Sequence, residues 1–174
     1  DEQVELLVRA AELDVGLQRD GVVALDERIE ELVQRDGLAA LEALAEVVTL
    51  EHARHGVASS DLDLVAALPE EELLGRKFRR VTPKSAAPIY FRPDADGGKI
   101  EITRIDNVDQ FEDDLCRRDF TINAIALNLR DTTIIDPLNG ATDIRAKIIR
   151  ACSSNALAND PVRILRAIRQ AAAF

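Results

Sequence analysis

The alternation of hydrophobic and polar residues predicts a strand over residues 60–65. Asp61 and Asp63 stand two positions apart in it, so both carboxylates project from one face, while Leu62 and Leu64 point the other way into a core. Two carboxylates held side by side on a rigid element match the oxygen ligands that Mg²⁺ prefers. Asp-x-Asp also occurs in solvated loops, so this motif alone leaves both interpretations open.

Two further runs, 87–92 and 99–104, alternate in the same way and are separated by a turn rich in Asp and Gly, which predicts a hairpin. Alternation in the second run puts Glu101 on the polar face of its strand. Glu101 is therefore a candidate third carboxylate beside Asp61 and Asp63. The alternative is a solvated partner for a charge on the neighbouring strand.

Helical periodicity and capping residues predict most of the remaining elements. Before the first strand, an acidic helical region is predicted with helices at 2–16, 26–32 and 38–48. After it, helices are predicted at 70–75, 109–118 and 143–146, and a last one that begins at Asn159-Asp160-Pro161. Short strands are predicted at 125–129, 132–135 and 148–150.

The composition predicts a globular chain, because 47% of its 174 residues are hydrophobic. The longest apolar runs are too short to cross a bilayer and no signal peptide precedes the first predicted helix, so no membrane contact is expected. Cys116 and Cys152 have neither metal-ligand nor redox spacing, which favours the reducing cytoplasm. The chain begins at Asp1 and holds no methionine, which indicates a processed fragment or a sequence that lacks segments.

The charge is spread unevenly along the chain, whose net charge is −10. Residues 1–73 hold 19 acidic and 5 basic residues, whereas residues 74–174 hold 13 acidic and 17 basic ones. The overall acidity argues against a nucleic-acid-binding protein. The basic balance of the second part is nevertheless compatible with a phosphate-rich partner.

The run Leu-Cys-Arg-Arg-Asp-Phe-Thr-Ile-Asn-Ala-Ile-Ala at 115–126 resembles the most characteristic motif of the class II tRNA nucleotidyltransferase and bacterial poly(A) polymerase family. Four other segments resemble parts of that family in the same order. They are the metal-binding strand at 61–65, the third-carboxylate strand at 100–103, the turn Ile135-Asp136-Pro137 with Gly140 and Asp143, and the nucleotide-selecting helix at 160–166.

This resemblance implies an α+β fold: a polymerase-β-like nucleotidyltransferase head with a small mixed sheet flanked by helices. The implied organisation is an N-terminal acidic helical segment at 1–48, the head domain at 49–152, and the start of a helical neck at 153–174. The neck would carry the nucleotide-selecting helix.

The resemblance also implies template-independent transfer of CMP or AMP from a nucleoside triphosphate to an RNA 3′ end. The favoured acceptor is tRNA, and the substrates are ATP and, for CCA addition, CTP. Asp61 and Asp63 would hold two Mg²⁺ ions, and Glu101 would complete the catalytic site. Activation of the attacking hydroxyl and neutralisation of phosphate charge, rather than a covalent nucleophile, would drive the reaction.

Six further residues would bind the nucleotide if the resemblance holds. Arg118 offers a planar fork for phosphate or sugar oxygens, Asp119 would orient it, and Asn123 would offer an amide. In the last helix, Asp160 and Arg163 would read the edge of the base, with Arg166 near by. The alternative is that Asp160 only caps the helix and the arginines are solvated.

Other functions remain open at this point. CCA addition, A addition and polyadenylation share every motif present. The family's glycine pair and Arg-Asp are absent near 46–52, where the chain reads Glu-Val-Val-Thr-Leu-Glu-His, so a catalytically inactive RNA-binding relative is the alternative. An acidic helical interaction protein would explain residues 1–48 but not the ordered motifs.

Overall fold

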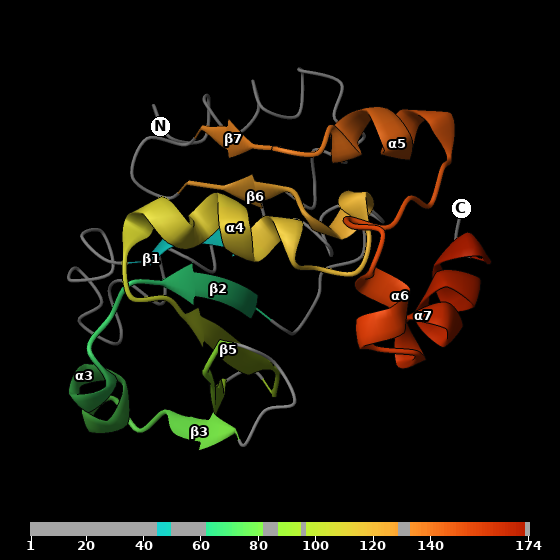
Figure 1. Ribbon diagram of the computed structural model, residues 1–174. Coiled ribbons are helices and arrows are strands. Elements are labelled where there is room, and N and C mark those ends of the chain that lie inside the picture. Colours follow the sequence, from blue (N-terminus) through green and yellow to red (C-terminus); the bar gives the residue numbers. More distant parts are fainter. Residues whose placement is uncertain (1–44, 50–61, 82–86, 95–96, 129–132, 173–174) are drawn as a thin grey trace.

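The computed structural model describes residues 45–49, 62–81, 87–94, 97–128 and 133–172. Across these ranges the strands form one mixed sheet in the order β3-β4-β5-β2-β1-β6-β7 (Figure 1). The strand pair β2–β5 is parallel, and the other pairs are antiparallel. The strands are β1 (Ala45–Thr49), β2 (Leu62–Ala66), β3 (Arg79–Val81), β4 (Ile89–Pro93), β5 (Lys99–Arg104), β6 (Ala126–Leu127) and β7 (Ile134–Ile135).

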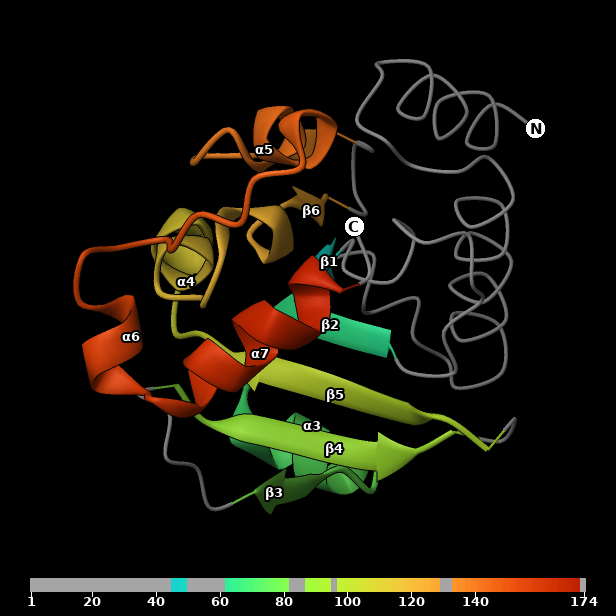
Figure 2. The same cartoon turned by 90° about the vertical axis from the view of Figure 1, so that its right-hand side faces the viewer.

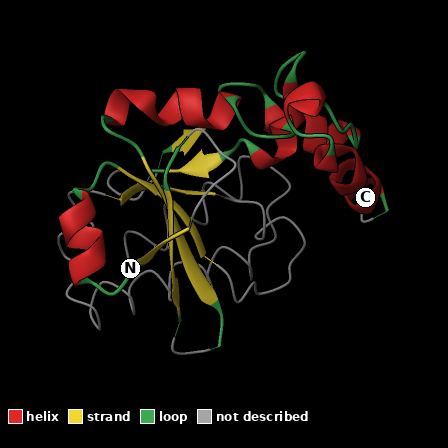
Figure 3. Cartoon of the chain, turned by 60° about the horizontal axis from the view of Figure 1, so that its bottom comes forward, coloured by secondary structure: helices red, strands yellow, loops and turns green. Residues whose placement is uncertain are grey.

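The helices lie around the strands rather than among them (Figure 3). They are α3 (Glu70–Gly75), α4 (Phe111–Cys116), α5 (Gly140–Ala146), α6 (Ala156–Asn159) and α7 (Val162–Ala171), with 3₁₀ turns at Val108–Gln110 and Thr121–Asn123. This arrangement confirms the predicted α+β class, with a mixed sheet flanked by helices.

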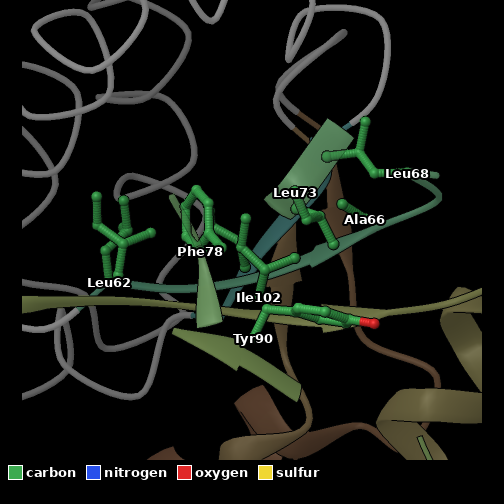
Figure 4. Close-up of a cluster of buried hydrophobic side chains, with 9 residues drawn as sticks. Leu62, Ala66, Leu68, Leu73, Phe78, Tyr90 and Ile102 are labelled. Atoms are coloured by element: carbon green, nitrogen blue, oxygen red, sulfur yellow. The ribbon is translucent and has the colours of Figure 1, made fainter. Parts of the chain in front are cut away.

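One face of the sheet is closed by hydrophobic side chains from β2, β4, β5 and the segment around α3. The residues of this cluster, which we call the α3-side core, are all buried (Figure 4): Leu62, Leu64, Ala66, Leu68, Leu73, Phe78, Tyr90, Ile100 and Ile102. Helix α3 contributes Leu73, and its first turn carries three glutamates, which suit the positive end of the helix dipole. This core fixes which face of β2 and β5 points away from solvent.

The opposite face carries a second cluster, which we call the α4-side core. It joins Val65 of β2 to Phe111 and Leu115 of α4, and it includes Ile105, Ala124 and Ala126. Helix α7 also lies on this side, because it crosses in front of β2 and β5 in Figure 2 while α3 lies behind β4. The two views agree that α3 and α7 flank the sheet from opposite sides.

Two predictions of secondary structure are wrong. The helix predicted at 38–48 does not extend over residues 45–48, because β1 occupies them and pairs with both β2 and β6. Sheet pairing here outweighs the helical preference of an Ala- and Leu-rich run. The strand predicted at 148–150 is not formed; a single bridge joins Phe120 to Ala151 instead. The helices predicted at 2–16 and 26–32 lie outside the described residues.

Candidate active site

The two described carboxylates of the predicted metal site lie side by side. Asp63 of β2 and Glu101 of β5 are register partners in the parallel pair, so their side chains project from the same face on neighbouring strands. Their neighbours Leu64 and Ile102 point into the α3-side core, so Asp63 and Glu101 point toward the side on which α7 lies. Both are half-buried. Strand alternation therefore places two oxygen-donor groups together on a rigid support.

Asp61 lies outside the described residues. Within the described ranges, no group of three His, Cys, Asp or Glu side chains is close enough to hold a metal ion. Lys99 Nζ lies 3.1 Å from Glu101 Oε2, and 31% of the Glu101 side chain is exposed. The described part of the candidate metal site is therefore a carboxylate pair with one cation beside it.

The motif at 115–126 folds into the end of α4 and a 3₁₀ turn that is stabilised by Asp119. This carboxylate is 5% exposed. Its Oδ1 accepts hydrogen bonds from the Phe120 backbone N–H at 2.8 Å and from Asn123 Nδ2 at 3.0 Å, and its Oδ2 lies 2.9 Å from Arg166 Nε. Asn123 is itself 2% exposed. Asn123 thus donates a hydrogen bond to Asp119 in this structure, and the predicted contact of both residues with a nucleotide stays a prediction.

Arg118 is oriented by a different acid from the one predicted. Its Nη2 lies 3.4 Å from Asp114 Oδ2, one helical turn earlier, and its Nη1 donates to the Asn123 carbonyl at 3.4 Å. Among the described residues no hydrogen bond or ion pair joins Asp119 to Arg118, and the predicted orienting role of Asp119 stays a prediction. The buried Nε of Arg118 has no hydrogen-bond partner within the described part of the chain. The Arg118 side chain is 20% exposed, and its predicted contact with a nucleotide stays a prediction.

Helix α5 holds the 3₁₀ turn from its other side through Asp143, which is 3% exposed. Asp143 Oδ2 accepts hydrogen bonds from Thr121 Oγ1 at 2.6 Å and from Arg150 Nε at 2.9 Å, while Oδ1 accepts from Arg150 Nη2 at 2.9 Å. The Arg150 guanidinium, followed by the Thr121 hydroxyl, holds the pKa of Asp143 below its usual range against the opposing effect of burial. Asp143 thereby ties α5 to the motif.

The start of α5 is built for close contact with the same turn. Asp136 accepts hydrogen bonds from the backbone N–H groups of Gly140 at 2.7 Å and Ala141 at 3.0 Å, which caps the helix. A Cβ on Gly140 would collide with the carbonyl oxygen of Thr121. Only glycine therefore allows α5 to approach the turn this closely.

Arg163 connects α7 to the end of the motif. Its Nη1 donates to the carbonyls of Arg118 at 3.0 Å and Ala156 at 3.3 Å, and its Nη2 donates to the Arg117 carbonyl at 3.1 Å. The sequence predicted that this guanidinium reads a base. In the structure its two terminal nitrogens face backbone carbonyls, and base reading stays a prediction.

Asp160 stands at the start of α7, as predicted, and its Oδ1 accepts a hydrogen bond from the Val162 N–H at 3.2 Å. Its side chain is 50% exposed and lies 3.9 Å from Arg163 Nε. Asp160 thus combines the capping role with an accessible carboxylate, and base reading by Asp160 stays a prediction.

The contacts of Asp114, Arg150 and Arg166 were not anticipated from the sequence. For Asp114 a signal existed, because it stands four residues before Arg118 in a predicted helix. The Arg166–Asp119 and Arg150–Asp143 pairs join different elements, and local spacing carries no signal for them. Burial raises the pKa of Cys152 to about 12, so this thiol is no candidate nucleophile at neutral pH.

Residues 82–150 match the model of the poly(A) polymerase head domain family. A multifunctional CCA protein of Legionella pneumophila (strain Lens) is 37% identical over 132 residues, which cover 68% of this chain and 31% of that protein. The chain belongs to the tRNA nucleotidyltransferase and poly(A) polymerase family. Another family member, a CC-adding tRNA nucleotidyltransferase of Geobacter sulfurreducens, is 54% identical over 59 residues, or 34% of this chain and 14% of that protein.

The family fold is found in solved structures as well. A CCA-adding enzyme in complex with CTP matches with a TM-score of 0.67 and 25% identity, over 89% of this chain and 41% of that one. This chain therefore spans less than half the length of each of these family members. No helix in the described ranges has the length and apolar character needed to span a membrane.

Proposed function

We propose that this chain is the head of a template-independent RNA nucleotidyltransferase that adds CMP or AMP to an RNA 3′ end, with tRNA as the favoured acceptor. The observation that carries the proposal is the register of Asp63 with Glu101 on the sheet face toward α7. Membership of the family supports the same chemistry, because its named relatives include CC-adding and CCA proteins. The unpaired cysteines suit a reducing compartment, and we propose the cytoplasm.

The carboxylate pair fits a divalent cation. Asp63 and Glu101 are half-buried oxygen donors on adjacent strands, which is the donor set that Mg²⁺ prefers. We propose that Asp61 and Asp63 hold two Mg²⁺ ions and that Glu101 completes the site. When bound, the ions would lower the pKa of the attacking hydroxyl and neutralise charge on the triphosphate.

In the proposed reaction the RNA 3′ oxygen forms a bond to the α-phosphorus, and the bond from that phosphorus to the pyrophosphate oxygen breaks. The hydroxyl proton leaves to solvent or to a carboxylate of the site. Arg118 would donate to phosphate or sugar oxygens through its guanidinium group. Asp160 and Arg163 would face the base, with ATP and, for CCA addition, CTP as substrates.

The test offers ATP and CTP separately and together to the full-length protein, with a tRNA that lacks its 3′ end and with an unstructured RNA. Addition of C followed by A to the tRNA identifies CCA addition, and A alone on a tRNA that ends in CC identifies A addition. Long A runs on either RNA identify a poly(A) polymerase. RNA binding without incorporation under all conditions would refute the enzymatic proposal and identify an inactive relative.

A further inference from the structure

A row of side chains crosses the sheet from the carboxylate pair to the edge strand β3. Glu101 of β5 is in register with Asp63 on one side and with Phe91 of β4 on the other. Phe91 is in turn in register with Arg79 of β3. Register partners on adjacent strands project from the same face and lie about 5 Å apart. The row therefore extends the candidate metal site by an aromatic ring and a guanidinium group.

The contacts of the alternate positions show which face carries the row. Tyr90 Oη donates a hydrogen bond to Glu70 Oε1 of α3 at 2.8 Å, and Arg80 Nη1 lies 3.4 Å from the same oxygen. Both side chains thus point toward α3. Their chain neighbours Phe91 and Arg79 therefore point toward the face that carries the carboxylates.

Phe91 and Arg79 are available to a ligand. Phe91 is half-buried and belongs to neither the α3-side core nor the α4-side core as defined above. Arg79 is exposed, and it makes no hydrogen bond or ion pair with the residues that the structure describes. An aromatic ring stacks on a base of any sequence, and a guanidinium group binds phosphate oxygens. This combination is typical of a surface that binds a single strand of nucleic acid.

The row extends away from the motif at 115–126. Figure 2 shows β4 and β3 below β5, whereas α4, β6 and α5 lie above β2. In-line transfer needs the attacking oxygen and the leaving pyrophosphate on opposite sides of the α-phosphorus. With the triphosphate toward Arg118 of the motif, the RNA 3′ oxygen approaches from the side of β4.

We propose that Phe91 and Arg79 hold the 3′ end of the acceptor RNA: Phe91 stacks on the terminal base, and Arg79 binds the backbone phosphate of that nucleotide. Arg79 stands two strands, or about 10 Å, from Glu101, so its charge serves the RNA backbone rather than the reacting phosphorus. This inference rests on the proposed function and deepens it, because it assigns a subsite to the acceptor.

Each of the two residues has a matched control. Arg80 carries the same charge on the same strand but faces α3 in an ion pair between largely exposed groups, so Arg80→Gln removes a charge without changing the row. Phe91→Tyr keeps the aromatic ring, whereas Phe91→Leu keeps an apolar side chain and loses the stacking surface. The two variants of Phe91 therefore separate stacking from packing.

The kinetic experiment measures KM for a tRNA that lacks its 3′ end and KM for the triphosphate, in the full-length protein. We expect Phe91→Leu to raise KM for the tRNA about tenfold, as when one stacked base is lost, and Arg79→Gln to raise it by a smaller factor. Phe91→Tyr and Arg80→Gln should change it less than about twofold. KM for the triphosphate should stay close to wild type in all four variants.

Two kinetic results would overturn the proposal. An unchanged KM for the tRNA in Phe91→Leu would mean that the ring does not contact the acceptor. A raised KM for the triphosphate in the same variant would mean that the ring contacts the incoming nucleotide instead.

Fluorescence supplies a readout that does not depend on activity. An RNA with a fluorescent adenine analogue as its 3′-terminal base should be quenched when it binds the wild type, and less so in Phe91→Leu, with melting temperature measured on the same samples. Equal or absent quenching in the two proteins would overturn the proposal. If the wild type incorporates no nucleotide but quenching still depends on Phe91, the proposed function fails and the acceptor subsite stands.

Discussion

The two faces of β2 and β5 are built by the same strands and serve different ends. On one face, Leu64 and Ile102 lie in the α3-side core, which is hydrophobic throughout (Figure 4). On the other face, Asp63 of β2 and Glu101 of β5 are register partners on neighbouring strands, and both are half-buried. Residues one position apart therefore contribute to stability on one side and to candidate chemistry on the other.

The polar face of β2 and β5 depends on the hydrophobic one. The side chains of Asp63 and Glu101 have fixed directions only because the alternate positions are locked into a core, and a slip of register by one residue would exchange the two faces. Substitutions at adjacent positions should therefore have separable effects.

The largest expected effect comes from the polar face. Asp63→Asn removes a charge from the proposed metal site without changing the size of the side chain. We expect nucleotide incorporation to fall by at least about 100-fold, as when one preorganised electrostatic group is lost. Denaturant unfolding should be nearly unchanged. Retained incorporation in a single-turnover assay would remove Asp63 from the reaction.

The adjacent position on the hydrophobic face should show the opposite behaviour. Leu64 is 4% exposed, so Leu64→Ala should lower the free energy of unfolding by about 2–5 kcal/mol through lost burial and a cavity. Urea unfolding measures this change. Incorporation per folded molecule should stay close to wild type, and a large loss there would mean that the two faces are not separable.

Gly140→Ala tests whether stability and activity are linked on the α4 side of the sheet. Its Cβ would meet the Thr121 carbonyl, which should lower the free energy of unfolding by about 1–3 kcal/mol. Unlike Leu64→Ala, it should also raise KM for the triphosphate, because Thr121 belongs to the turn that Asp119 holds. A Gly75→Ala variant is the control, since nothing lies within 4 Å of the added Cβ.

Acid should weaken the contact between α5 and the 3₁₀ turn. We expect this effect to be smaller than the effects of the three substitutions above. The pKa of Asp143 is lowered in the folded state, so its contribution to stability is complete above its ordinary pKa of about 3.9 and is lost as pH falls through the lower folded value. In Arg150→Gln the acid-side decline of the melting temperature should be shallower. An identical pH profile in the two proteins would contradict this account.

The features that the sequence predicted well are those with a local cause. Strict alternation after a Gly-Gly turn predicted β5 with the bounds that the structure has, and it predicted the face on which Glu101 lies. Partners that come from other elements were not predictable. Because Arg118 and Asp119 are adjacent in the motif, the sequence predicted that Asp119 orients Arg118. In the structure Asp119 forms an ion pair with Arg166, which only the packing of α7 brings close.

Because β2 and β5 run in parallel, they cannot be joined by a tight turn, and α3, β3 and β4 intervene between them. Asp63 and Glu101 therefore meet only after a long loop has closed, at an entropic cost that local contacts do not offset. We expect cation affinity to appear in refolding only once β2 has paired with β5. A nascent chain released before β5 would lack the contribution of Glu101 to that affinity.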